Sequence, residues 1–280
     1  MQVVFTDLDG SLLDRDTYSF EAARPALEWL TECGIPLVFV SSKTRSELAF
    51  WRRAIGNVHP FVMENGGAIV IPKGYFEGSF PGHRPSRTLG VIELGTRYPR
   101  LVTELRRASG AARCRTRGFN DMTPEHIASH FSLSLNQARM ARKREFDEPF
   151  LILDGGRKEA LLQEIERAGL TCSSGGRLLH LTGHSDKGIA VRELIRRYKL
   201  AWGPVRTLGL GDGMNDLPML ESVSVPVILR SPAARKLSRL LPSAMVTDAA
   251  GPEGWNQAVL SLVAHERAPS RKAALQMRPQ

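Results

Sequence analysis

The sequence has few cysteines and no long apolar run. Its 280 residues include only Cys33, Cys114 and Cys172, which are scattered and form no CxxC pair. This pattern excludes a disulfide framework and a cysteine zinc site, and it indicates a reducing compartment. No uncharged apolar run approaches the roughly 18 residues that a membrane span needs. The first residues also lack a basic segment followed by an apolar one, so we expect a cytoplasmic protein without a signal peptide or a membrane partner.

Aromatic residues are also scarce, at 7% of the chain, and acids are outnumbered by bases. The 38 Lys and Arg against 29 Asp and Glu give a net charge of +9. A basic surface attracts nucleic acid, anionic lipid or phosphorylated metabolites. A nucleic-acid-binding module would interleave its bases with exposed aromatics, whereas the run Arg139–Arg144 has only Phe146 beside it. We therefore expect a small anionic ligand and no nucleic-acid partner; the sequence indicates no oligomeric state.

Strands and helices alternate at both ends of the chain. Apolar runs predict strands near 2–6 and 35–40, and helical patterns cover 20–33 and 44–55. The segment PFVMENGGAIVIP predicts two short strands around the turn Asn65-Gly66-Gly67. The alternation returns with helices at 187–198, 216–221 and near 255–264, and strands at 205–210 and 224–229. It predicts an α/β protein with a doubly wound parallel sheet and helices on both faces.

A Gly- and Pro-rich segment, Lys73–Arg87, interrupts this alternation and predicts a domain boundary. The middle of the chain has its own cycle, with strands expected near 88–94, 113–116, 149–153, 170–174 and 177–183, and helices at 98–108, 123–130, 135–144 and 158–168. We expect a Rossmann-like core made of residues 1–82 and 185–265, an inserted α+β cap over 83–184, and a basic tail over 266–280.

Two carboxylates stand one residue apart at the end of the first predicted strand. In VVFTDLDGSLL they are Asp7 and Asp9, followed by Gly10. Two bare carboxylates about 4 Å apart repel by roughly 4 kcal/mol at an effective dielectric near 20. No basic residue stands beside them in sequence, so a shared divalent cation is the simplest partner.

A second predicted strand, within TLGLGDGMNDLPML, is also followed by glycine and acidic residues. Here Asp212 follows the strand, and Asn215 and Asp216 open a helix. In a doubly wound sheet, ligands bind outside the carboxyl ends of the strands, so these acids are expected to meet Asp7 and Asp9 there. Taken alone, Asp7 fits a turn residue better than a metal ligand, and Asp216 fits a helix cap better. Four acids at two such junctions instead predict a Mg²⁺ site.

Four short motifs together carry a family resemblance. DLDGSLL, VSSKT, DKG and GDGMNDLPML resemble, in order and spacing, the motifs of haloacid-dehalogenase-like (HAD) phosphatases with the large inserted cap of the sugar-phosphate group. Ser11 stands where that family usually has threonine, so the hydroxyl is kept. The resemblance implies a magnesium-dependent phosphatase that works through an aspartyl-phosphate.

The resemblance also implies residue roles. Asp7 would be the nucleophile and Asp9 the general acid and then the general base. Lys187 would neutralise phosphoryl charge, and the Ser41 hydroxyl would donate to a phosphoryl oxygen, with Ser42 as its competitor. Magnesium would be held by the Asp7 side chain, the Asp9 carbonyl, Asp212 and Asp216.

Three further segments are similar to mannosyl-3-phosphoglycerate phosphatases: ENGGAIVIP, ARMARKREFDEPF and RLLHLTGHSDKG. They imply a sugar-glycerate phosphate as substrate. The candidate substrate-binding residues are Gly10, Ser42, Asn65, Gly66, Arg139, Arg142, His180 and Thr182. A bland alternative stays open for several of them, since the arginines fit a solvated helix face, His180 fits a structural histidine, and Asn65 fits a turn residue.

Two other activities fit the same motifs. One is hydrolysis of a different sugar phosphate, such as glucosyl-3-phosphoglycerate. The other is a phosphomutase, which transfers the phosphoryl group to a second sugar hydroxyl instead of to water.

Overall fold

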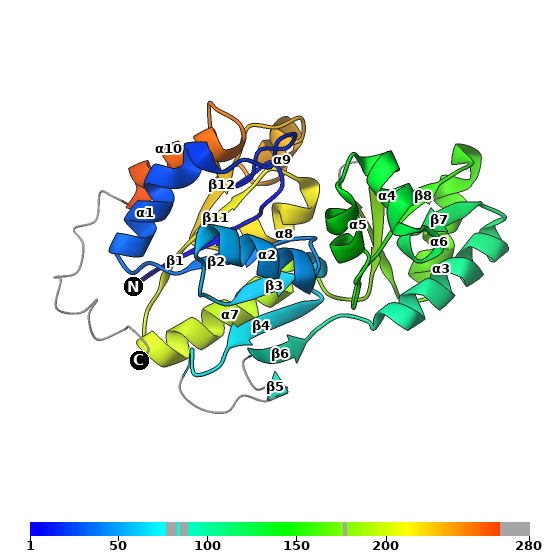
Figure 1. The fold of residues 1–280 in the computed structure, drawn as a ribbon, viewed down its shortest axis with the longest axis horizontal. Helices are drawn as coiled ribbons and strands as arrows, with labels where there is room; N and C mark the ends of the chain where they lie inside the picture. The colour runs from blue at the N-terminus through cyan, green and yellow to red at the C-terminus, as the bar shows by residue number, and fades with distance from the viewer. Residues whose placement is uncertain (77–82, 85–88, 176–177, 264–280) are drawn as a thin grey trace. The chain divides into compact units, whose positions relative to one another are not determined.

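The computed structural model describes residues 1–76, 83–84, 89–175 and 178–263 (Figure 1). The chain divides into two compact units, Met1–Val40 with Val191–Gln280, and Ser41–Ala190. The expected basic tail and most of the segment 77–88 lie outside the described residues. No helix in the described part of the chain combines the length and the apolar content of a transmembrane span.

A parallel sheet forms the centre of the first unit. Its strands lie in the order β13-β12-β11-β1-β2. Their bounds are β1 Gln2–Thr6, β2 Leu37–Val40, β11 Arg206–Gly211, β12 Val225–Ile228 and β13 Met245–Val246. The apolar run Val3–Phe5 has no exposed surface, as expected for a strand that is buried on both faces. The predicted parallel sheet is confirmed over these strands.

Helices cover both faces of this sheet. They are η1 Glu21–Ala23, α1 Arg24–Glu32, α7 Lys187–Trp202, η5 Met214–Asp216, α8 Leu217–Leu220, α9 Ala234–Leu240 and α10 Gly251–Val263. Phe5 makes an edge-to-face contact with Tyr198 of α7, and its neighbour Thr6 accepts a hydrogen bond from the Trp255 Nε1 of α10, at 2.9 Å. Successive strand residues point to opposite faces, so α7 and α10 lie on opposite faces. Figure 1 shows α1 beside α10.

The second unit begins with a capped helix and antiparallel strands. Thr44 and Glu47 form a capping box at the start of α2 (Arg45–Ile55), and Gly56 ends that helix in the left-handed region. The strands β3 (Phe61–Met63), β4 (Ala68–Pro72), β6 (Leu89–Glu93) and β5 (His83–Arg84) pair in that order. The turn η2 (Glu64–Gly66) joins β3 to β4, as the Asn-Gly-Gly sequence predicts.

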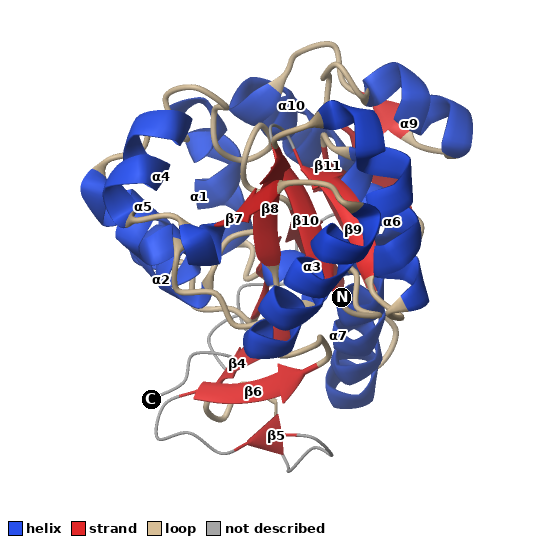
Figure 2. Ribbon diagram, turned by 90° about the vertical axis from the view of Figure 1, so that its right-hand side faces the viewer, coloured by secondary structure: helices blue, strands red, loops and turns tan. Residues whose placement is uncertain are grey.

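A separate four-stranded sheet completes the second unit, in the order β7-β8-β10-β9 (Figure 2). Its strands are β7 Thr116–Gly118, β8 Glu148–Ile152, β9 Thr171–Gly175 and β10 Leu178–Thr182. Its helices are η3 Phe119–Asp121, η4 Gly155–Arg157, α3 Tyr98–Ala112, α4 Pro124–Phe131, α5 Leu135–Ala141 and α6 Lys158–Arg167. Phe150 packs with α3 and α6, and its neighbour Leu151 packs with α4 and α5. The helix pairs therefore cover opposite faces.

The element order expected from sequence is confirmed, with several local differences. The sequence did not predict α9, β13 or β5. The helix expected to end at 108 continues to Ala112, so the following strand begins at Thr116 rather than at 113. The helix expected over 135–144 ends at Ala141. The strand expected at 88–94 pairs with β4. The cap boundaries at 83 and 184 stay a prediction.

Candidate active site

Three buried carboxylates meet at the ends of neighbouring strands in the first unit. Asp7 follows β1 and Asp212 follows β11, and these two strands are paired in parallel. Asp216 ends η5. One oxygen from each of the three carboxylates lies within 4.8 Å of the others, and the residues are at most 6% exposed. Residues 205 positions apart therefore come together as the sequence predicted for a sheet edge.

Backbone and side-chain donors fix the orientation of this group. Asp216 Oδ2 accepts hydrogen bonds from the backbone N–H of Asp212, at 3.0 Å, and of Gly213, at 2.8 Å. Ser11 Oγ donates to Asp212 Oδ1 at 3.3 Å, and Arg15 forms an ion pair with the other oxygen of Asp212. The sequence analysis did not single out Arg15, whose side chain is 56% exposed and whose partner lies 197 residues away.

Gly10 lets the loop after Asp9 pass close to Asp212. Its φ of +76° is in the left-handed region, and a Cβ there would lie 2.8 Å from Asp212 Oδ2. The candidate Gly10 thus has a geometric reason to be glycine. The Asp9 side chain is not one of the three clustered carboxylates, and the metal contact expected from its backbone carbonyl stays a prediction.

The donor set fits a hard divalent cation. The three clustered carboxylates supply oxygen ligands only, and Mg²⁺ prefers carboxylate oxygens together with water and phosphate oxygens. The backbone N–H groups of Asp212 and Gly213 hold one oxygen of Asp216. Asp7, Asp212 and Asp216 are therefore the residues that would hold the ion.

Ser41 and the residues after it belong to the second unit. Ser41 directly follows β2 and is fully buried; its Oγ accepts a hydrogen bond from the Lys43 N–H at 3.2 Å. The Ser41 N–H donates to the Val62 carbonyl at 3.1 Å, and the Ser41 carbonyl accepts from the Asn65 N–H at 3.0 Å. These bonds hold the Ser41–Thr44 loop against the end of β3. Ser42 stays an alternative for the phosphate contact, since its side chain is less buried.

Lys187 is 1% exposed and is the first residue of α7. Asp186 precedes it, and the Asp186 Oδ1 accepts the Ile189 N–H at 2.7 Å, which caps the helix. Gly66, with a φ of +92°, packs onto this junction: a Cβ on Gly66 would lie 2.0 Å from the Asp186 carbonyl oxygen. The candidates Gly66 and Lys187 are thus neighbours in the same unit.

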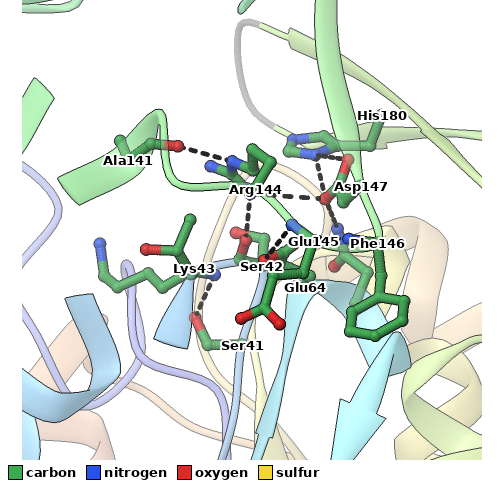
Figure 3. A network of polar contacts seen from close by, with 12 residues as sticks. Ser41, Ser42, Lys43, Glu64, Ala141, Arg144, Glu145, Phe146, Asp147 and His180 are labelled. Carbon is green, nitrogen blue, oxygen red and sulfur yellow. Dashed lines mark hydrogen bonds and ion pairs between the residues drawn. The ribbon is translucent and has the colours of Figure 1, made fainter. Parts of the chain in front are cut away.

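Two further candidates, Asn65 and His180, meet on a residue that the sequence analysis did not single out. Asp147 has no exposed surface and accepts hydrogen bonds from Asn65 Nδ2, at 2.9 Å, and from His180 Nδ1, at 2.8 Å. Figure 3 shows the contact between His180 and Asp147. His180 is 6% exposed, and Thr182, two residues further on the same strand face, is 3% exposed. The only sequence signal for Asp147 was its place in the acidic pair Asp147-Glu148, which precedes the apolar run PFLIL.

A buried arginine and a buried glutamate extend this network. Arg144 donates to the carbonyls of Ala141 and Ser42, and Glu64 accepts the backbone N–H groups of Glu145 and Phe146 (Figure 3). Burial raises the pKa of Glu64 to about 7, although Arg144 and the two backbone N–H groups partly oppose the shift.

Arg139 and Arg142 do not join this network. Both are exposed, and Arg142 is the C-cap of α5, with its N–H donating to the Ala138 carbonyl. Arg144, which the sequence analysis did not select as a candidate, has a buried side chain, 6% exposed.

Comparison with known proteins decides the family. A model of the haloacid dehalogenase-like hydrolases matches residues 4–79 and 118–236. The chain is a haloacid dehalogenase-like hydrolase. It is 40% identical over 266 residues to a glucosyl-3-phosphoglycerate/mannosyl-3-phosphoglycerate phosphatase of Methanococcoides burtonii, covering 93% of this chain and 97% of that protein. It is 33% identical to a mannosyl-3-phosphoglycerate phosphatase of Pyrococcus furiosus, covering 82% and 91%.

Solved structures agree on the fold of this HAD hydrolase. A HAD-superfamily phosphatase of Bacteroides thetaiotaomicron superimposes with a TM-score of 0.64 at 19% identity, covering 93% of this chain and 94% of that one. A HAD subclass IIB sugar phosphatase gives the same TM-score at 14% identity, covering 93% and 98%. The predicted fold, an α/β HAD core with an inserted cap, is confirmed, as is the predicted resemblance to mannosyl-3-phosphoglycerate phosphatases.

Proposed function

We propose that this HAD hydrolase is a Mg²⁺-dependent phosphatase that converts mannosyl-3-phosphoglycerate, or its glucosyl counterpart, into the glycosylglycerate and inorganic phosphate. The observation that carries the proposal is the buried group of Asp7, Asp212 and Asp216 in a chain of this family. The names of its relatives supply the substrate class. The three free cysteines agree with the cytoplasmic location that we propose with it.

Asp7 is the proposed nucleophile. One of its oxygens attacks phosphorus, the bond from phosphorus to the glycerate oxygen breaks, and Asp9 gives that leaving oxygen a proton. Asp9 then takes a proton from water, the water oxygen attacks the aspartyl-phosphate, and phosphate leaves with Asp7 restored. One acid therefore serves both half-reactions, because the first half-reaction leaves Asp9 deprotonated.

The proposed ligands of Mg²⁺ are the Asp7 carboxylate, the Asp9 carbonyl, Asp212 and Asp216. When bound, the ion neutralises charge on the phosphoryl oxygens and on the crowded carboxylates. Asp216 accepts the N–H groups of Asp212 and Gly213, and these bonds hold the backbone of Asp212 beside it.

Residues of the second unit, together with Gly10 of the first, are proposed to bind the phosphoryl group and the rest of the substrate. Ser41 would donate a hydrogen bond to a phosphoryl oxygen, and Lys187 would neutralise its charge. The proposed substrate contacts are Gly10, Ser42, Asn65, Gly66, Arg139, Arg142, His180 and Thr182. Asn65 and His180 are supported by their common anchor Asp147, which fixes both side chains, whereas the exposed Arg139 and Arg142 have charge alone in their favour.

The test is phosphate release from a panel of phosphorylated sugars and glycosylglycerates, with Mg²⁺ and with chelator. We expect turnover of the mannosyl or glucosyl ester that chelator abolishes and that Asp7→Asn lowers about 10³-fold or more. Asp16→Asn, an exposed acid of the same loop, is the control and should retain activity. Activity that survives Asp7→Asn would overturn the mechanism, and turnover of other esters alone would overturn the substrate. Transfer of labelled phosphate to a second sugar hydroxyl would instead indicate a mutase.

A further inference from the structure

One segment of the chain, Met140–Glu148, holds the Ser41–Thr44 loop and the η2 turn from one side. Thr44 Oγ1 donates to the Met140 carbonyl at 2.9 Å. Glu64 Oε2 accepts the Phe146 N–H at 2.6 Å, and Asn65 Nδ2 donates to Asp147 at 2.9 Å. The Met140–Glu148 segment, which lies about 80 to 100 residues further along the chain, thus contacts both the loop and the η2 turn.

Arg144 makes a hydrogen bond to the backbone of the Ser41–Thr44 loop. Its Nη1 donates to the Ser42 carbonyl at 2.8 Å, and its Nε donates to the Ala141 carbonyl at 2.7 Å (Figure 3). The same Nη1 lies 3.7 Å from Asp147 Oδ2, and the guanidinium lies over the Phe119 ring. The side chain is 6% exposed. Its Nε and Nη1 groups are thus directed at acceptors within the protein.

The surroundings keep Arg144 charged. Burial lowers the pKa of a guanidinium, but Asp147, Glu47, Glu64 and Glu148 lie close enough to raise the pKa of Arg144 on balance. A buried charge is costly unless it is paired and hydrogen-bonded. Arg144 therefore neutralises the buried acids around it, and its hydrogen bond to the Ser42 carbonyl is the contact that also reaches the loop.

We propose that Arg144 is a positioning residue that fixes the Ser41–Thr44 loop through the Ser42 carbonyl. The bond sets the plane of the Ser42–Lys43 peptide. The N–H of that same peptide belongs to Lys43 and donates to Ser41 Oγ at 3.2 Å. One peptide therefore links the guanidinium to the Ser41 hydroxyl, and the orientation of that hydroxyl depends on Arg144. This inference rests on the proposed role of Ser41 in binding the phosphoryl group.

Lysine should replace arginine poorly here. The planar guanidinium reaches the Ser42 and Ala141 carbonyls at once with two nitrogens in a fixed geometry, whereas an ammonium is a single point on a flexible stem. Arg144→Lys keeps the positive charge among the carboxylates but loses the two guanidinium nitrogens that reach both carbonyls at once. It therefore separates the positioning of the loop from the neutralisation of buried acids.

Arg45 provides a matched control in the same region. Its guanidinium pairs with Glu145 at 2.9 and 3.0 Å, so it also joins α2 to the Met140–Glu148 segment, but this pair is about one-third exposed and does not touch the Ser42 carbonyl. Arg45→Lys therefore perturbs a neighbouring arginine–carboxylate contact without changing the bond to the loop.

The experiment compares Arg144→Lys with Arg45→Lys in the full chain by steady-state kinetics, inhibition by inorganic phosphate, and hydrogen exchange of the backbone amides. For Arg144→Lys we expect kcat/KM to fall at least 10-fold, inhibition by phosphate to weaken in parallel, and the amides of residues 42–44 to exchange faster than in wild type. For Arg45→Lys we expect changes below 2-fold. Equal effects of the two variants, or an Arg144→Lys protein that loses stability with unchanged phosphate inhibition and exchange, would overturn the inference.

A failed substrate assignment gives a different pattern. If wild type hydrolyses no ester of the panel, the proposed function is wrong, but hydrogen exchange at residues 42–44 still tests the link from Arg144 to the loop. If wild type is active and Arg144→Lys alters neither exchange nor phosphate inhibition, the proposed function stands and the positioning role is wrong.

Discussion

His180 Nδ1 lies 2.8 Å from Oδ2 of Asp147, a carboxylate with no exposed surface. The same oxygen accepts a hydrogen bond from Asn65 Nδ2, at 2.9 Å. Asp147 thus fixes the ring of a β10 residue and the amide of the η2 turn at once. A buried carboxylate needs such partners, because its desolvation is otherwise uncompensated.

Removing this charge should destabilise the protein. Asp147→Asn leaves the His180 ring and the nearby Arg144 without a buried anion between them, so we expect a loss of about 3 kcal/mol in the free energy of unfolding, measured by urea denaturation. Asp121→Asn is the control, since Asp121 also pairs with an arginine, Arg106, but both side chains are more than 40% exposed. That variant should lose less than about 1 kcal/mol. A similar loss in both variants would contradict a special role for Asp147.

The sequence predicted the acidic residues of the site better than the buried residues, Asp147 and Arg144, that hold other candidates in place. Asp7, Asp212 and Asp216 stand directly at strand ends, and the pairing of parallel strands alone determines that such ends meet. Asp147 lies 82 residues from Asn65 and 33 from His180, so only tertiary packing brings the three together. Arg144 was missed because the helical pattern was extended to residue 144, whereas α5 ends at Ala141 and the Arg144 side chain is buried.

Local sequence also determined where the fold was predicted well. The Asn-Gly-Gly turn, the Thr44 cap and Gly56 carry their own backbone preferences, so β3, β4 and the bounds of α2 follow from short segments. The sequence missed α9, β13 and the two-residue strand β5. Such short elements form because neighbours are available to pack or pair with them, and a single-sequence pattern does not contain that information.

Glu64 should make stability depend on pH. Its pKa is raised from 4.5 to about 7 in the folded protein by burial, so the folded state holds a proton that the unfolded state releases between these values. Stability from this group is therefore complete below about pH 4.5 and is lost as the pH rises to about 7, by on the order of 3 kcal/mol. Glu64→Gln carries no titrating carboxyl and should lack this loss.

The measurement is the difference in unfolding free energy between wild type and Glu64→Gln from pH 4.5 to pH 8. We expect wild type to lose stability relative to the variant as the pH rises. Glu148, whose pKa burial likewise raises to about 7, is present in both proteins and cancels in the difference. Glu159→Gln, on an exposed position of α6, is the matched control. A difference that is flat with pH would show that Glu64 is ionised in the folded protein throughout.

Gly66 should be the least replaceable glycine of the second unit. Its φ of +92° disfavours a side chain, and a Cβ there would lie 2.0 Å from the Asp186 carbonyl oxygen, directly before Lys187. The Asp186 carbonyl belongs to the backbone and cannot move aside as a flexible side chain can. Gly66→Ala should therefore push the η2 turn away from the start of α7. We expect a loss of more than about 2 kcal/mol in stability and a fall of at least 10-fold in kcat/KM.

Gly74→Ala separates the effect of backbone strain at a positive φ from the effect of displacing the η2 turn. Gly74 has a similar positive φ of +73°, but a Cβ there would meet nothing within 4 Å. It should therefore lose only about 1 kcal/mol, the cost of a left-handed residue with a side chain, and keep its kinetics. If both alanine variants lose the same stability and the same activity, backbone strain alone explains Gly66. If Gly66→Ala alone loses activity, then the approach of the turn to Asp186 is what holds Lys187 in position.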